Sequence, residues 1–107
     1  PFPFSGGLTS CEALWSGVPV VTWAGDRMCG RQTASFLSRV GLDDLIAGTR
    51  EEYIERVVDL AADGPRRAIL RTELRGRMQD GPLCDARRLA EEFTAAVEEA
   101  YRRLAVL

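Results

Sequence analysis

Apolar residues follow two different spacings along this chain, one in each half. In the first half, Val18 to Trp23 is a short, almost wholly apolar run rich in β-branched residues. Such a run is typical of a strand buried on both faces of a parallel sheet. A Gly-rich loop over residues 1–7 and a short helix ending near Gly17 precede this run, and a helix over about 29–40 follows it.

The second half of the chain has apolar residues at helical spacing throughout. Thr49 and Glu52 form a Thr-x-x-Glu capping box at the start of the first helix there. Asp-Gly-Pro sequences at 63–65 and 80–82 separate three helices, the last beginning near Asp85. Their apolar side chains are Tyr53, Val57, Leu60, Ala61, Ile69, Leu70, Leu74, Met78, Leu89, Phe93, Val97, Tyr101 and Leu104.

The order of these elements predicts an α/β fold, with a small parallel sheet followed by several helices. The run from Val18 to Trp23 is the strong strand, and Leu45–Ala47, after a helix stop at Gly41, is a brief edge strand. Two strands are too few for a complete domain of this class. We therefore expect a parallel partner strand upstream of residue 1, and we interpret the chain as a fragment.

The composition is that of an ordinary soluble domain. The 107 residues are 46% apolar and 28% charged, with 14 basic and 16 acidic residues. This near balance gives no electrostatic reason to expect nucleic acid or a membrane surface as a partner, and no apolar run approaches the roughly 20 residues that span a bilayer. The three cysteines form no C-x-x-C pair and His is absent, so we expect no metal site. A reducing, cytoplasmic location is the simpler interpretation.

The candidate chemistry lies where the Gly-rich loop enters the first helix. Thr9 is a good N-cap, and Glu12 completes a Thr-x-x-Glu capping box. The start of a helix offers free backbone N–H groups and a positive dipole, which together suit a phosphate. Taken alone, the local pattern favours the simpler interpretation, in which Thr9 and Glu12 only cap their own helix.

The stretch from Phe2 to Thr22, FPFSGGLTSCEALWSGVPVVT, resembles the C-terminal catalytic segment of the O-GlcNAc transferase/SPINDLY family. The first half of the chain carries this resemblance, and the helical half is similar in its general pattern only. The further matching positions are Gly25-Asp26-Arg27, Arg31, Ser35, Val40-Gly41-Leu42, Leu45-Ile46-Ala47 and Glu52-Tyr53.

This resemblance implies a glycosyltransferase of the GT-B type, with two Rossmann-like domains preceded by tetratricopeptide repeats, in a bacterial-type protein. Residues 1–107 would be a single C-terminal fragment of the nucleotide-sugar-binding domain, a partial Rossmann-like unit. Residues 1–48 would be its donor-site part and 49–107 its helical part. The donor would be a UDP sugar such as UDP-N-acetylglucosamine, bound without a metal or another cofactor, and the acceptor a Ser or Thr of an intracellular protein.

By position in the family motif, the resemblance assigns donor-binding roles to five residues. Thr9 and the backbone of Ser10 would meet the diphosphate, and Glu12 would bind the ribose hydroxyls. Gly6 and Gly7 would let the backbone approach the ligand closely. No catalytic residue is expected within the chain, because it has no Lys or His to act as cation or base. The fragment alone is therefore expected to be inactive, and upstream domains of the same protein would complete the enzyme.

Two alternatives stay open. Leu8 stands where family members often have a polar residue, which favours a non-catalytic packing or interaction module. A related enzyme could instead use a different donor, such as GDP-fucose. Outside the motif, we interpret Cys11, Trp15 and Trp23 as core residues, and we expect Arg31 to make a structural pair, with Asp26 as one partner.

Overall fold

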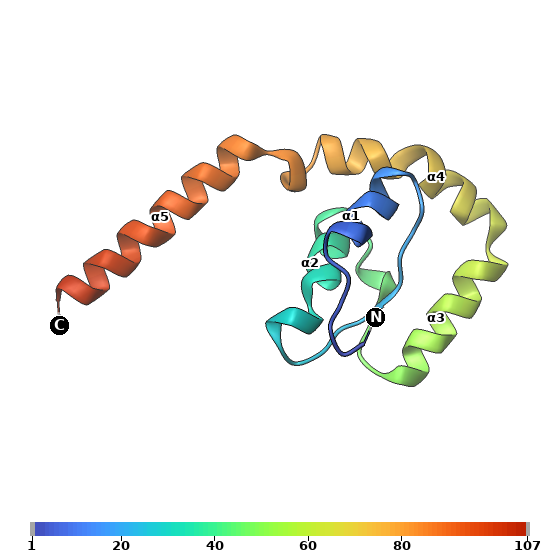
Figure 1. Ribbon diagram of the computed structural model, residues 1–107. Coiled ribbons are helices and arrows are strands. Elements are labelled where there is room, and N and C mark those ends of the chain that lie inside the picture. Colours follow the sequence, from blue (N-terminus) through green and yellow to red (C-terminus); the bar gives the residue numbers. More distant parts are fainter. Residues whose placement is uncertain (1, 107) are drawn as a thin grey trace.

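The computed structural model describes residues 2–106, which form a helix-rich body around a two-stranded parallel sheet (Figure 1). The α-helices and strands are α1 (Leu8–Trp15), β1 (Thr22–Trp23), α2 (Gln32–Arg39), β2 (Ile46–Ala47), α3 (Arg50–Ala62), α4 (Gly64–Gln79) and α5 (Ala86–Ala105). Three 3-10 turns complete the order: η1 (Met28–Gly30), η2 (Asp43–Leu45) and η3 (Pro82–Cys84).

The sheet pairs β1 with β2 in parallel, with Thr22 opposite Ile46 and Trp23 opposite Ala47. The predicted edge strand is confirmed, but the predicted strand over 18–23 forms only in its last two residues. Strand propensity favours an extended chain, whereas a strand also needs a hydrogen-bonded neighbour, and β2 offers only two residues. The predicted upstream partner strand lies outside the chain and stays a prediction.

The predicted helix ends are correct at both glycine stops. Gly17 and Gly41 follow the last residues of α1 and α2 with φ of +79° and +75°, the left-handed conformation that favours glycine. The predicted capping box at the start of α1 is wrong. The carbonyl of Gly7 already accepts from the N–H groups of Ser10 and Cys11, so the helix begins at Leu8 and Thr9 lies inside its first turn.

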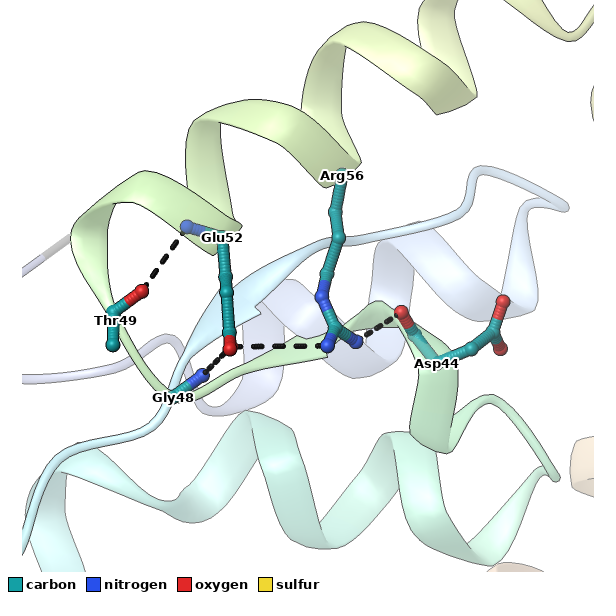
Figure 2. A network of polar contacts seen from close by, with 5 residues as sticks. All are labelled: Asp44, Gly48, Thr49, Glu52 and Arg56. Atoms are coloured by element: carbon teal, nitrogen blue, oxygen red, sulfur yellow. Dashed lines mark hydrogen bonds and ion pairs between the residues drawn. The ribbon is translucent and has the colours of Figure 1, made fainter.

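The same Thr-x-x-Glu pattern is a true cap at the start of α3 (Figure 2). The Oγ1 of Thr49 accepts from the N–H of Glu52 at 3.1 Å, and Oε2 of Glu52 accepts from the N–H of Gly48 at 2.8 Å. Arg56 lies 3.8 Å from that carboxylate and donates to the carbonyl of Asp44. This network fixes the turn between β2 and α3.

The hydrophobic core lies among α1, α2, α4 and the loops around the sheet. Leu14, Leu37, Leu45 and Leu74 are its largest fully buried side chains. The apolar positions of α3 are mostly on the surface, and Leu60 is its buried residue. Of the other residues predicted to be core, Trp15 is 40% exposed, Trp23 is half-buried against the ring of Phe2, and Cys11 is half-buried at the edge of the core.

Helix α5 extends away from the body and meets it near η3 (Figure 1). Its apolar stripe matches the predicted spacing, yet all five of its large apolar side chains are at least half exposed: Leu89, Phe93, Val97, Tyr101 and Leu104. Residues 2–106 therefore supply no packing surface for this face. Among the described helices, none is both long enough and apolar enough to cross a membrane.

Candidate functional site

The parallel sheet brings three helix N-termini to one edge of the body. Helices α2 and α3 follow β1 and β2, so both helices begin beyond the carboxyl ends of the strands, in the lower part of Figure 1. The start of α1 lies at the same edge, because Gly6 and Ser10 line one cleft with Thr22 and Trp23 of β1. Open α/β sheets bind their ligands at this edge.

A cleft of about 380 Å³ lies at this edge. Its polar lining comes from the loop before α1, from α1 itself, from β1 and from α2, and aromatic residues flank it. The residues that line it are Phe2, Ser5, Gly6, Ser10, Val20, Val21, Thr22, Trp23, Thr33 and Tyr53. The cleft is thus built from segments up to 51 residues apart in the sequence, from Phe2 to Tyr53.

Two hydroxyl groups hold the loop before α1 against α2. The Oγ1 of Thr33 donates to the carbonyl oxygen of Gly6 at 2.8 Å and lies 3.0 Å from the Oγ of Ser10. Thr33 is 2% exposed and Ser10 is 7% exposed, so water does not compete for these hydrogen bonds. Ser5 adds a second attachment, because its N–H and its Oγ both donate to the carbonyl of Cys29, at 2.9 and 3.1 Å.

The start of α1 presents free backbone donors beside the cleft. The N–H of Ser10 donates to the carbonyl of Gly7 at 3.1 Å. The N–H groups of Gly7, Leu8 and Thr9 make no hydrogen bond to another described residue. Three unsatisfied donors at the positive end of a helix dipole form a site that suits an anion. These three differ from the predicted pair, Thr9 and Ser10, because the helix begins earlier than the sequence indicated.

The five predicted site residues occupy two different surroundings. Gly6 and Ser10 line the cleft, whereas Gly7, Thr9 and Glu12 lie outside its lining. A Cβ on Gly6 would lie 2.4 Å from the Oγ of Ser10, so the packing of the loop itself requires glycine there. Glu12 and Thr9 are exposed, and the carboxylate of Glu12 makes no cap bond to α1. The predicted contacts of these five residues with a donor stay predictions.

Sequence reasoning missed the polar residues that complete the cleft. Thr33 comes from α2, 27 residues after Gly6, and only the folded chain brings the two together. Thr22 carried a usable signal, because it is the polar residue near the end of an apolar run that precedes a ligand-binding edge. Arg31 makes its structural contact with the carbonyl of Gly25, at 2.7 Å, rather than with Asp26.

The cysteine in α1 is a poor candidate for chemistry. Burial raises the pKa of the Cys11 thiol above its ordinary value, and the nearby Cys84 and Glu12 raise it further. A raised pKa keeps the thiol protonated near neutral pH and lowers its nucleophilicity. Among the described residues, no group of three or more His, Cys, Asp or Glu side chains could hold a metal ion.

The arrangement defines a class of protein: an α/β unit in which a glycine-rich loop and a helix start lie beside a polar cleft at the carboxyl edge of a parallel sheet. This is how nucleotide-binding α/β folds present a phosphate site. The sequence model described as Glycosyl transferase family 41 matches residues 3–93. The chain therefore belongs to this family.

Curated relatives and a solved structure agree with the assignment. The chain is 43% identical over 103 residues to a probable UDP-N-acetylglucosamine–peptide N-acetylglucosaminyltransferase SPINDLY of Oryza sativa, and 35% identical over 85 residues to the SEC protein of Arabidopsis thaliana, also named as a probable enzyme of this activity. These matches cover 96% and 78% of this chain.

The solved structure is the K341M mutant of Thermobaculum terrenum O-GlcNAc transferase, which is 44% identical to this chain. The match has a TM-score of 0.74 and covers 95% of this chain and 19% of the solved one. The expected fold class, a partial Rossmann-like unit of a GT-B enzyme, is confirmed. The chain spans 11% of the rice relative's length and 9% of that of the SEC protein.

Proposed function

We propose that this chain is the donor-binding part of a glycosyltransferase that transfers a sugar from a UDP donor, UDP-N-acetylglucosamine, to Ser or Thr hydroxyls of proteins. The observation that carries the proposal is the set of free N–H groups at Gly7, Leu8 and Thr9, next to a polar cleft at the carboxyl edge of the sheet. Membership of Glycosyl transferase family 41, and relatives that are named as UDP-N-acetylglucosamine–peptide N-acetylglucosaminyltransferases, support a UDP sugar as the ligand of this site.

In the reaction, the acceptor oxygen attacks the anomeric carbon while the bond from that carbon to the diphosphate oxygen breaks. Negative charge then grows on the leaving UDP. Fixed N–H groups and a helix dipole stabilise such charge without having to reorganise, which is a large source of rate acceleration. The start of α1 would perform this role without a metal. The proton of the acceptor would go to a base that we place outside residues 1–107, which include neither His nor Lys.

The apolar side chain of Leu8 does not prevent this site from binding the sugar donor. Its side chain is 75% exposed and cannot contact a phosphate as a donor, but its backbone N–H is one of the three free donors at the start of α1. The loss of a polar side chain there removes one contact and leaves the backbone site intact. This reasoning favours an active enzyme over a non-catalytic packing module. A GDP sugar stays an alternative donor, which competition between UDP and GDP distinguishes.

Glu12 supplies the test of the ribose contact. In the intact protein that contains residues 1–107, Glu12→Gln should raise the donor KM roughly tenfold with little change in kcat, because a carboxylate accepts hydrogen bonds from hydroxyls more strongly than an amide does. Steady-state kinetics with varied UDP-N-acetylglucosamine measures the effect. Glu55→Gln, an exposed glutamate of α3, is the matched control and should leave the donor KM unchanged. Equal donor KM values for both variants would remove Glu12 from the donor site.

A further inference from the structure

We propose that Thr33 is a positioning residue, which aims the N–H of Gly7 at the donor diphosphate from a distance. This inference rests on the proposed function, since it concerns how the same anion site is held in shape. Thr33 lies at the second position of α2 and is 2% exposed. It contacts the loop through a single hydroxyl group.

The direction of the hydrogen bonds around Thr33 follows from the proton count. A threonine hydroxyl has one proton, and the carbonyl of Gly6 can only accept, so the Thr33 proton lies on the 2.8 Å bond to Gly6. Ser10, 3.0 Å away, must then donate its own proton to the Thr33 oxygen. The result is a relay of two hydrogen bonds, from Ser10 to Thr33 and from Thr33 to Gly6, buried between α1 and α2.

The peptide group between Gly6 and Gly7 connects these two hydrogen bonds to the anion site. The carbonyl of Gly6 and the N–H of Gly7 belong to one planar trans peptide, so they point in opposite directions. Because Thr33 holds the carbonyl toward α2, the N–H of Gly7 must point away from α2. The hydroxyl of Thr33 therefore sets the direction of a donor that it never touches.

Because of the same hydrogen bonds, Ser10 has no donor left for a phosphate. Its hydroxyl proton goes to Thr33 and its backbone N–H goes to the carbonyl of Gly7. A side chain on Gly6 would displace the Ser10 oxygen from this position, since a Cβ there would lie 2.4 Å from it. Glycine at position 6 is thus required by these hydrogen bonds, which set the direction of the Gly7 N–H.

The test compares two pairs of variants that differ mainly by the hydroxyl group. Thr33→Val keeps the shape of threonine without its hydroxyl, and Thr33→Ser against Thr33→Ala repeats the comparison on a smaller side chain. Calorimetric titration of the intact protein with UDP should show roughly tenfold weaker binding for Thr33→Val and Thr33→Ala, and binding within about twofold of wild type for Thr33→Ser. If the valine variant does not fold, the comparison of Thr33→Ser with Thr33→Ala still provides the test.

The control is Ser38→Ala, which removes a hydroxyl from the same helix. Ser38 donates to Asp43 at 2.9 Å, at the opposite end of α2 from the loop, so its loss should leave UDP affinity unchanged. A ligand-free measurement separates positioning from general stability. The amide resonance of Gly7 should shift in Thr33→Val and Thr33→Ala, and should return toward its wild-type position in Thr33→Ser.

The outcomes distinguish the two proposals. If wild-type protein does not bind UDP, the proposed function fails and the role of Thr33 toward a donor fails with it. If wild type binds UDP and the variants without the hydroxyl bind it equally well, the donor site stands and the positioning role of Thr33 is overturned. Weaker binding by both hydroxyl-deficient variants, with rescue by serine, supports both.

Discussion

Gly17→Ala should lower the free energy of unfolding by roughly 2–5 kcal/mol, the largest effect we expect from adding a single methyl group. Two costs combine at this position. Gly17 has φ of +79°, which an L-residue with a side chain adopts only with strain. Its Cβ would also lie 2.5 Å from the carbonyl oxygen of Arg71, which is backbone of α4 and cannot move aside without distorting that helix.

Gly76→Ala is the matched control for this substitution. Gly76 lies inside α4 and a Cβ there would have no atom within 4 Å. Alanine should therefore raise the free energy of unfolding by about 0.5–1 kcal/mol, because it restricts the unfolded chain and favours the helix. Urea denaturation followed by circular dichroism measures both variants. Similar shifts in the same direction would contradict the account of how α1 ends against α4.

Leu14→Ala should destabilise the protein by roughly 2–5 kcal/mol, the usual range for a leucine deleted from a closed core. Leu14 is fully buried on the inner face of α1, among the leucines of α2 and α4. The loss includes both the burial of the side chain and the cavity that it leaves. The change should be visible as a lower denaturation midpoint with an unchanged dependence on urea concentration.

Leu8→Ala is the control on the same helix. Its side chain is 75% exposed, so the same truncation there should change the free energy of unfolding by less than about 0.5 kcal/mol. A large loss at Leu8, or a small one at Leu14, would mean that α1 is packed with a different face toward the core. The Ser10 face, and with it the cleft, would then be misplaced.

These two predictions concern the body that holds the anion site. Helix α4 fixes the C-terminal end of α1. Arg75 donates to the carbonyl of Trp15 at 3.0 Å and lies over its ring, 5.2 Å from the ring centre. Thr33 of α2 fixes the loop at the other end of the helix. The start of α1 can therefore present its N–H groups in one orientation before any ligand arrives, which lowers the cost of binding.

The two Thr-x-x-Glu patterns show what the sequence could and could not predict. Both contain a threonine, a glutamate and preceding glycine, yet only Thr49 caps its helix. Thr49 follows a paired strand whose end is fixed by β1, so the helix cannot begin earlier. No paired strand precedes Thr9, and Gly7 takes the cap position of α1 instead. The Thr-x-x-Glu pattern indicates a local preference for capping, and the structure that precedes the helix determines which residue takes the N-cap position.

The sequence indicated where the candidate site lies, but it did not indicate which residues from other elements complete it. The family motif indicated the start of α1, and both Gly6 and Ser10 do line the cleft there. The role of Thr33 could not be predicted, because a hydrogen bond across 27 residues has no signature in local spacing. The stripe on α5 had the clearest helical spacing of all, but spacing does not say whether the chain supplies a partner for it.

The central claim is that the start of α1 binds the diphosphate of a UDP donor, and its most direct test is a titration of the isotopically labelled chain with UDP. Dispersed amide resonances first establish that the chain is folded. We predict that UDP at millimolar concentration shifts the amides of Gly7, Leu8 and Thr9 most, with Gly6 and Glu12 following, while those of α5 stay in place. If the amides from Gly6 to Glu12 do not move under these conditions, the start of α1 in this chain does not bind UDP, which contradicts the claim for these residues.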